Sequence, residues 1–316
     1  MSEIVVSILV HRDFSHIHAA LESLVNATRR PCRVIVVVNI GEQADIDALA
    51  TAFPQVEIIV NKKPQSFAAN HNLVMQSAQA TYYALLNDDI VMLDNALDRV
   101  IDYLDNHPDV AVAGPRLENP NGSYQVSVYS DPTLFRMIYK MSGLAQFTRQ
   151  GSWLRSLVMR LVNLPVQSLR IPQAASAVDV VKGAVMVVRG TAYQQVGPMD
   201  EVTLAYGEEI DWHLRFRKAG WKVAVVPVAR VTHLGGGQSE LRLRGWQLVE
   251  DRKAILNYFI KHKPRWQVIV LRCAIVLSHS LSGLLWLLVN RQRAGNHLQV
   301  ARIGMFWNRR KESTSL

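Results

Sequence analysis

The sequence predicts an α/β fold in which a mixed, mainly parallel sheet is flanked by helices and a helical C-terminal region follows. Over roughly the first hundred residues, apolar runs rich in β-branched side chains alternate with helix-like segments, a pattern typical of βαβ units. The chain has 316 residues, of which 49% are hydrophobic and 19% charged. It can therefore bury a large core, and a disordered protein is excluded.

Four strands and three helices are expected in this first part of the chain. The strands are residues 4–10, 34–38, 57–60 and 82–86, and the helices between them are 19–25, 46–53 and 68–79. Parallel strands joined by helices bind ligands at their carboxyl ends. Asn87, Asp88 and Asp89 follow the fourth strand and are expected at that edge.

Further acids and one histidine occur much later in the chain. They are Glu208, Glu209, Asp211 and His233. Carboxylates that end a buried strand suit a divalent cation, Mg²⁺ or Mn²⁺, bridging phosphate oxygens, and a later carboxylate suits a general base. This combination favours transfer of a sugar from a nucleotide. From the residues alone, a solvated turn for 87–89 and an ordinary loop position for His233 remain open.

The formal net charge of +9 is unevenly distributed along the chain. Residues 132–178 contain six Lys or Arg and no acid, whereas residues 252–316 contain twelve Lys or Arg and one acid, Glu312. Since these segments carry +6 and +11, the rest carries −8. Aliphatic stripes, rather than stacking aromatics, accompany the basic residues, which favours a membrane surface over nucleic acid.

The C-terminal region is expected to associate with a membrane. Residues 266–289 are largely apolar, with Arg272 and His279 seven residues apart and therefore on one helical face. That arrangement favours a helix lying in the interface, or a shallow hairpin, over a full span. Residues 153–164 also fit an interfacial helix, or equally a surface helix packed on the core. No basic segment precedes the first apolar run, so a cytoplasmic protein held peripherally on the inner face of the plasma membrane is expected.

Short blocks along the chain resemble one known family. They include Phe-Ala-Ala-Asn-His-Asn at 67–72, Leu-Leu-Asn-Asp-Asp at 85–89 and Glu-Glu-Ile-Asp-Trp-His-Leu-Arg at 208–215; the others are 6–10, 34–41, 182–189, 196–201, 220–223 and 227–236. Together, in this order and spacing, they resemble the family 2 inverting glycosyltransferases with the GT-A fold, most of all the rhamnosyltransferase branch. Each block alone is a weak signal.

The resemblance implies roles for individual residues. It places a divalent metal at Asp89, with Asn87 and His233 as further ligands, and the general base at Glu209, with Asp211 and Glu208 orienting the acceptor. Donor-binding positions are Val10, His11, Asn39, Phe67, Asn72, Asn87, Asp88 and Gly183.

Several positions depart from the family pattern, among them His11-Arg12-Asp13, which replaces the commoner Thr-Tyr-Asn type of sequence after the first strand. Val38 stands where an Asp usually accepts a hydrogen bond from the nucleobase, so base recognition is expected to pass to Asn39 or to main-chain groups. Ser66 replaces a Gly, and Glu209 replaces an Asp as the base. A silent GT-A domain that serves as a membrane scaffold for glycan assembly is therefore the alternative to an active enzyme.

The expected organisation is a GT-A domain at residues 1–240 and a basic, apolar helical region at 241–316. Within the first, residues 1–115 bind the nucleotide, 116–178 form a basic amphipathic insertion and 179–240 hold the acceptor. The expected reaction transfers a sugar, with rhamnose as one candidate, from a dTDP- or UDP-linked donor to a saccharide or lipid-linked acceptor in cell-surface polysaccharide assembly. No nucleic acid partner is expected, and a homo-oligomer is left open.

Overall fold

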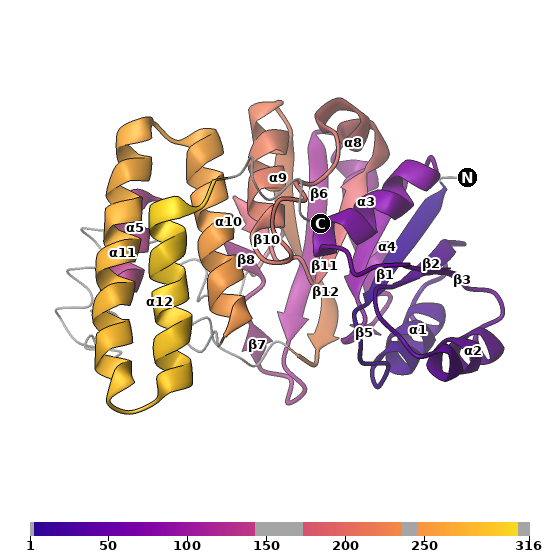
Figure 1. The fold of residues 1–316 in the computed structure, drawn as a ribbon. Helices are drawn as coiled ribbons and strands as arrows, with labels where there is room; N and C mark the ends of the chain where they lie inside the picture. Colours follow the sequence, from indigo (N-terminus) through magenta and orange to yellow (C-terminus); the bar gives the residue numbers. More distant parts are fainter. Residues whose placement is uncertain (1–2, 143–172, 236–244, 309–316) are drawn as a thin grey trace. The chain divides into compact units, whose positions relative to one another are not determined.

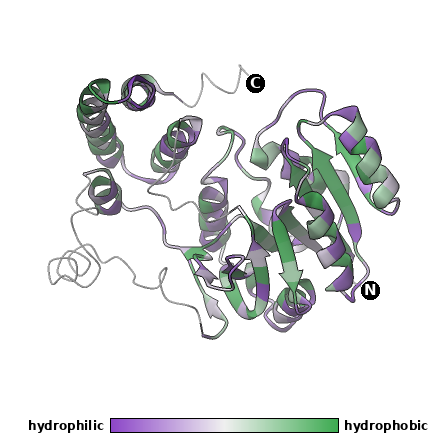
Figure 2. Ribbon diagram, turned by 90° about the horizontal axis from the view of Figure 1, so that it is seen from below, coloured by the Kyte–Doolittle hydropathy of each residue, from purple (hydrophilic) through white to green (hydrophobic). Residues whose placement is uncertain are grey.

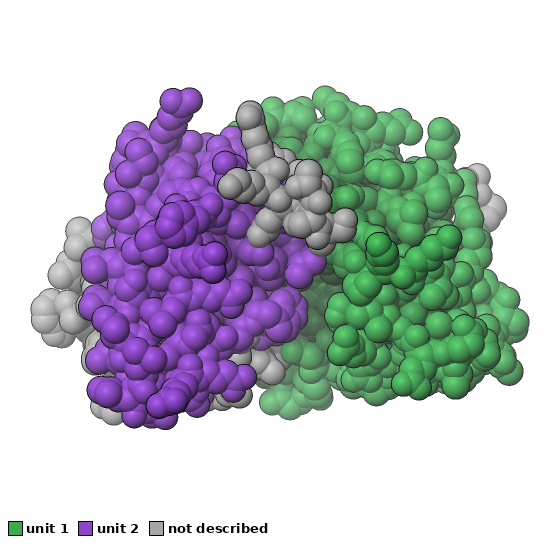
Figure 3. Space-filling view, viewed as in Figure 1, with its two compact units in different colours: residues 1–130, 167–201, 209–238 green, residues 131–166, 202–208, 239–316 purple. Residues whose placement is uncertain are grey.

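The computed structural model describes residues 3–142, 173–235 and 245–308. Two compact units divide the chain: unit 1 comprises residues 1–130, 167–201 and 209–238, and unit 2 comprises 131–166, 202–208 and 239–316 (Figure 3). Each unit is described by itself. The domain boundaries expected from the sequence at 115/116, 178/179 and 240/241 stay a prediction.

Unit 1 is built on one large, mainly parallel sheet (Figure 1). Its path runs β3-β2-β1-β4-β11-β6-β12-β5, while β7 pairs with β6 and β9 with β12. The strands are β1 (Ile4–Val10), β2 (Arg33–Val38), β3 (Glu57–Val60), β4 (Tyr82–Asn87), β5 (Ile90–Leu93), β6 (Val110–Glu118), β7 (Tyr124–Gln125), β9 (Ser176–Ala177), β11 (Val185–Arg189) and β12 (Lys222–His233). A separate pair joins β8 (Val128–Tyr129) to β10 (Val180–Val181).

Helices cover both faces of this sheet. They are α1 (Ile17–Asn26), α2 (Gln43–Ala52), α3 (Phe67–Ser77), α4 (Ala96–Asn106), α8 (Gly190–Val196) and α9 (Glu208–Lys218). Apolar side chains of α1, α2 and α4 share one core cluster with one face of the sheet, and those of α3, α8 and α9 share another cluster with the opposite face. The expected α/β fold with a mainly parallel, helix-flanked sheet is confirmed.

The central strand shows why β-branched runs mark this fold. All seven residues of β1 are buried, because helices cover both faces of a parallel sheet and leave no wet side. Ile4, Val6, Ile8 and Val10 face one core cluster and Val5 and Leu9 the other. Strands β1, β2, β3 and β4 run parallel, so their carboxyl ends meet at one edge.

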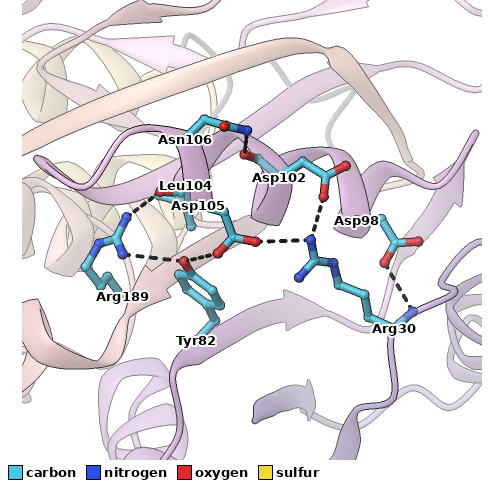
Figure 4. Close-up of polar contacts among 8 residues, drawn as sticks. All are labelled: Arg30, Tyr82, Asp98, Asp102, Leu104, Asp105, Asn106 and Arg189. Carbon is cyan, nitrogen blue, oxygen red and sulfur yellow. Dashed lines mark hydrogen bonds and ion pairs between the residues drawn. The ribbon is translucent and has the colours of Figure 1, made fainter. Parts of the chain in front are cut away.

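A polar network fixes α4 against the amino end of β4 (Figure 4). Arg30 pairs with Asp102 at 2.6 Å and with Asp105 at 3.1 Å, while the Tyr82 hydroxyl donates to Asp105 at 2.6 Å. Arg189 donates to the Leu104 carbonyl at 2.6 Å. These charges lie at the opposite end of β4 from Asp88, so they fasten the scaffold and take no part in the candidate site.

Unit 2 contains a group of helices: α5 (Leu134–Met141), α10 (Trp246–His262), α11 (Arg265–Leu287) and α12 (Arg291–Phe306). Helices α11 and α12 pack along each other through small residues. A Cβ at Gly283 would lie 2.9 Å from Leu298, and one at Gly304 would lie 3.0 Å from Ile275. The helix expected at 153–164 lies outside the described residues.

Candidate active site at the carboxyl ends of the strands

The parallel strands of unit 1 each deliver a polar residue to the same edge of the sheet. His11 follows β1, Asn39 follows β2, Asn61 follows β3 and Asp88 follows β4. Asn39 donates its main-chain N–H to the Val10 carbonyl at 2.8 Å. The sequence-predicted positions at Val10, His11, Asn39 and Asp88 are thus brought to one edge.

Asn39 is buried and its side chain is fully engaged. Its Oδ1 accepts from the main-chain N–H of Gln65 at 2.7 Å and from Asn61 at 2.9 Å, and its Nδ2 donates to the Gln65 carbonyl at 3.0 Å. These main-chain partners fix which end of the amide is which. Asn39 therefore shapes the pocket wall and has no group left over for a nucleobase.

The orientation of Asn39 sets the tautomer of His11. Asn39 Nδ2 lies 2.9 Å from His11 Nδ1, and since Nδ2 can only donate, Nδ1 must accept. The proton of the neutral ring then sits on Nε2. Burial, with a contribution from Arg12, lowers the pKa of His11, so the ring stays neutral at neutral pH. His11 is an exposed residue with an N–H donor to offer.

Helix α3 begins beside this network. Ser66 caps it by accepting from the Ala69 N–H at 3.1 Å, which gives Ser66 a structural role at the position where the resembling family has glycine. Phe67 packs edge-on against His71, with ring centroids 4.5 Å apart. Asn72 is buried and bonds to Met199 and Glu201. It anchors the segment before α9, and its amide is not open to a nucleotide.

The acidic motif forms the turn between β4 and β5. Asn87 donates its main-chain N–H to the Ala184 carbonyl at 3.0 Å, and its side chain hydrogen-bonds to Asp89. Burial and the charge of Asp89 raise the pKa of Asp88 to about 7. Burial also raises the pKa of Asp89, but contacts with His233 and Asn87 outweigh it, and that pKa lies below its ordinary value. The turn thus holds the carboxyl groups of Asp88 and Asp89 next to each other in a half-buried position.

His233 lies directly beside Asp89, because β12 pairs with β5 and brings His233 opposite Ile90. His233 Nε2 is 3.2 Å from Asp89 Oδ1, and the Gly235 N–H donates to Asp89 Oδ2 at 3.1 Å. Gly235 is required for this approach, since a Cβ there would lie 2.1 Å from Asp89 Oδ2. Three predicted positions, Asn87, Asp89 and His233, are therefore brought together.

A buried glutamine fixes the ring of His233. Gln125 Oε1 accepts from Lys182 Nζ at 3.1 Å, and Gln125 Nε2 donates to the His233 carbonyl at 3.2 Å. Because Lys182 can only donate and a carbonyl can only accept, the amide orientation is settled. His233 Nδ1, 2.6 Å from Gln125 Oε1, must carry a proton. The Nε2 atom of the neutral ring then directs its lone pair at Asp89 Oδ1.

The acids of α9 occupy three different environments. Glu209 is partly exposed, and its Cδ lies 3.8 Å from where a Cβ on Gly183 would be. Gly183 adjoins Ala184, the partner of Asn87, so Glu209 borders the acidic motif at residues 87–89. Asp211 is buried and accepts from Arg215 at 2.9 Å, a pairing that fixes the helix. Glu208 is buried at the first turn, in the 202–208 segment assigned to unit 2.

Sequence reasoning missed Gln125, Lys182, Asn61 and Gly235 as parts of this site. Gln125 and His233 are 108 residues apart, and a lone glutamine on a two-residue strand carries no pattern. Gly235 does carry a signal, because it begins a run of three glycines two residues after His233.

Comparison with known proteins identifies the family. A family model described as glycosyltransferase like family 2 matches residues 4–267. The chain belongs to this family. The N-acetylglucosaminyl-diphospho-decaprenol L-rhamnosyltransferase of Mycobacterium tuberculosis, from strains CDC 1551 and H37Rv, is 25% identical over 229 residues, which cover 69% of this chain and 71% of the relative. The protein is thus a glycosyltransferase, and the expected enzyme class is confirmed.

Two solved structures share the fold. GalNAc-T7 with UDP, GalNAc and Mn²⁺ has a TM-score of 0.55 at 12% identity, with 82% of this chain and 48% of that chain covered. The mannosyltransferase PcManGT from Pyrobaculum calidifontis, in complex with GDP-Man and Mn²⁺, has a TM-score of 0.54 at 10% identity, with 96% and 87% covered. This family 2 chain spans about half the length of the GalNAc-T7 chain. The GT-A fold expected from the sequence is confirmed.

Proposed function

We propose that this glycosyltransferase is a metal-dependent, inverting enzyme that transfers a sugar, with rhamnose as the first candidate, from a dTDP- or UDP-linked donor to a lipid-linked saccharide. The proposal is carried by the contacts that run from Gln125 to His233 and from His233 to Asp89 at the sheet edge. Glu209 borders the same turn. The name of the relative supports the sugar and the lipid-linked acceptor.

Asp89 and His233 are the residues proposed to hold a divalent cation. The described residues contain no group of three His, Cys, Asp or Glu side chains that could hold a metal ion, so further ligand positions are proposed to be filled by the donor phosphates. The fit rests on Asp89 Oδ1, a buried oxygen that lacks a well-formed hydrogen bond and faces His233 Nε2 at 3.2 Å. When bound, Mg²⁺ or Mn²⁺ neutralises charge on the departing nucleoside diphosphate.

The nucleotide is proposed to lie along the carboxyl ends of β1, β2 and β4. His11 Nε2–H is placed to donate to a carbonyl oxygen of a pyrimidine, which replaces the contact that Val38 lacks. Asn39 acts indirectly, by holding His11 and Gln65. Gly183 leaves room for the donor sugar beside Glu209, since a larger side chain would point at that carboxylate.

Glu209 is proposed as the general base. An acceptor hydroxyl has a very high pKa, so a carboxylate must take its proton as the oxygen attacks the anomeric carbon. One base and one displacement invert the configuration of that carbon. Asp211 keeps α9 in place through Arg215, which leaves Glu209 as the acid of α9 that borders Gly183.

The enzyme is proposed to work at the cytoplasmic face of the plasma membrane, in assembly of cell-surface polysaccharide. A lipid-linked acceptor confines the reaction to a membrane surface. Among the described residues, α11 is long and apolar enough to cross a bilayer.

A transfer assay tests the proposed function. Purified full-length protein is incubated with labelled dTDP-rhamnose, or with UDP-sugars, and an N-acetylglucosaminyl-diphospho-polyprenol. We expect metal-dependent formation of a disaccharide lipid with inverted anomeric configuration. Retention of configuration, or transfer that is unchanged by a chelator, contradicts the proposal.

Replacing Gln125 with Leu is expected to weaken Mn²⁺ binding about 10- to 100-fold, the usual effect of removing the group that orients a ligating histidine. Calorimetric titration with Mn²⁺ measures this without any turnover. Gln125→Glu keeps an oxygen for His233 Nδ1 and should bind Mn²⁺ more tightly than Gln125→Leu. Gln194→Leu, an exposed position on α8, is the control. If wild type and Gln125→Leu bind Mn²⁺ with equal affinity, Gln125 does not orient His233 for metal binding.

Replacing Gly235 with Ala is expected to abolish Mn²⁺ binding, because the added methyl group displaces the Asp89 carboxylate. Gly295→Ala is the matched control, since nothing lies within 4 Å of a Cβ at that position. Both variants are compared by Mn²⁺ titration and thermal unfolding. If Gly235→Ala binds Mn²⁺ with wild-type affinity, Mn²⁺ binding does not depend on the position that the Asp89 carboxylate occupies beside Gly235.

A further inference from the structure

Helix α11 exposes Arg265 at its first position, and every other residue of the helix that is exposed is apolar. These apolar residues are Trp266, Ile269, Val270, Cys273, Leu277, Leu281, Leu284, Leu285 and Leu287, and Leu288 and Val289 continue beyond the helix. Leu277 is 64% exposed, Leu285 71% and Leu288 88%. In Figure 2 this helix, the outermost at the left, is predominantly green. A patch of this length on a soluble surface marks an interaction site.

Two polar groups of α11, Arg272 and His279, lie on the opposite, packed face. The buried positions Leu271, Ile275, His279 and Gly283 recur every four residues. His279 Nδ1 is 3.0 Å from His297 Nδ1, and Arg272 donates to the Gly304 and Trp307 carbonyls at 2.9 and 2.8 Å. This is the reverse of a water-exposed helix, in which polar side chains point outward.

Helix α12 disfavours a membrane-spanning position for α11. It runs back along α11, as the contacts of Gly283 with Leu298 and of Gly304 with Ile275 require. Arg291, Gln292, Arg293, Gln299 and Arg302 of α12 are exposed. If α11 crossed a bilayer, Gln299 and Arg302 in the body of α12 would be carried into hydrocarbon, where charged and amide side chains are costly. A helix parallel to the surface buries only its outer face.

Charge favours lipid over a second copy of this chain. Residues 252–308 contain nine Lys or Arg and no Asp or Glu. Lys263 precedes α11, Arg265 is its first residue, and Arg293 stacks on Trp286 at the other end, 4.7 Å from the ring centroid. Two copies meeting through this face would bring like charges together, whereas anionic headgroups would complement them.

We propose that the outer face of α11 docks in the plane of an anionic phospholipid bilayer, with its apolar side chains about 5–10 Å below the headgroups. The inference deepens the membrane location in the proposed function, and it rests on the surface of unit 2 alone. Its test uses no sugar transfer, so it can fail while the catalytic proposal stands.

Binding of full-length protein to vesicles provides the first test. We expect binding to phosphatidylcholine vesicles that contain phosphatidylglycerol and weaker binding to phosphatidylcholine alone. Leu281→Glu with Leu285→Glu should weaken binding about 100-fold, roughly tenfold for each leucine withdrawn from lipid. Val25→Glu with Val228→Glu, 56% and 59% exposed in unit 1, adds the same charge and should leave binding unchanged. Circular dichroism checks that both variants fold.

Insertion depth provides the second test. A fluorophore on the exposed Cys273, in a Cys32→Ser background, or on Leu281→Cys or Leu288→Cys, is quenched by lipids that carry quenchers at defined depths. An in-plane helix gives the same shallow depth at all three positions. A profile deepest at Leu281→Cys indicates a span and overturns the proposal. A second result also overturns the proposal. In it, the wild-type protein binds neither kind of vesicle and sediments as a dimer, and Leu281→Glu with Leu285→Glu converts that dimer to a monomer.

Discussion

Replacing Glu209 with Gln is expected to lower the rate of sugar transfer about 10²- to 10⁴-fold, the range that a positioned general base contributes. The amide keeps the shape of the side chain beside Gly183 but cannot take a proton from the acceptor hydroxyl. Donor affinity should stay at the wild-type value, because the nucleotide is proposed to lie at the carboxyl ends of β1, β2 and β4. Single-turnover kinetics together with calorimetric donor titration separate the two effects.

The neighbouring acids provide matched controls for Glu209. Asp211→Asn is expected to act mainly through stability, because it weakens a buried ion pair with Arg215. Glu208→Gln changes the adjacent acid by the same single group. If Glu208→Gln stops transfer while Glu209→Gln retains the wild-type rate, the base is assigned to the wrong residue.

Replacing Asp89 with Asn is expected to abolish metal-dependent donor binding, with a loss of at least about 100-fold in affinity. Asn preserves the size of the side chain and its acceptor for the Gly235 N–H. The substitution removes the negative charge of Asp89 beside His233 Nε2. A hard divalent cation requires that charge. Thermal unfolding in chelator should change little, so the loss is attributable to the metal site.

Asp94→Asn is the matched control for Asp89→Asn. Asp94 pairs with Arg230 on the surface, where a single ion pair contributes little to stability. Its φ of 47° lies in the left-handed region, which Asn tolerates. If Asp94→Asn and Asp89→Asn reduce donor binding equally, the effect of Asp89→Asn comes from general loss of charge.

The regular part of the fold was predictable because local pattern and burial agree there. Residues 4–10, 34–38, 57–60 and 82–86 are apolar, β-branched runs, and the structure makes each of them a strand within one residue at either end. Burial on both faces leaves no other arrangement for such a run. The position of Asp88 and Asp89 at the sheet edge followed from the same rule.

The support of the site was not predictable, because it depends on contacts between distant segments. Gln125 reaches His233 across 108 residues, and β11 inserts antiparallel between β4 and β6, which brings Gly183 to the end of β4. The saturated amide of Asn39 and the buried amide of Asn72 look like nucleotide ligands in the sequence. Only their partners at Gln65 and Met199 reveal scaffolding roles.

The family resemblance contributed what physical pattern could not. From the pattern of residues alone, Asp89 fits a solvated turn and a metal ligand equally well. The structure places His233, Asp89 and Gln125 in one row because β12 pairs with β5 at the site. The ligand roles of these residues remain a proposal that binding measurements decide.

Calorimetric titration with nucleoside diphosphates and nucleotide sugars, in Mn²⁺ and again in chelator, tests the central claim most directly. We expect one pyrimidine nucleotide to bind in Mn²⁺, with affinity lost in chelator and in Asp89→Asn. Binding that is equally tight in chelator and in Asp89→Asn would contradict a metal site at Asp89 and His233.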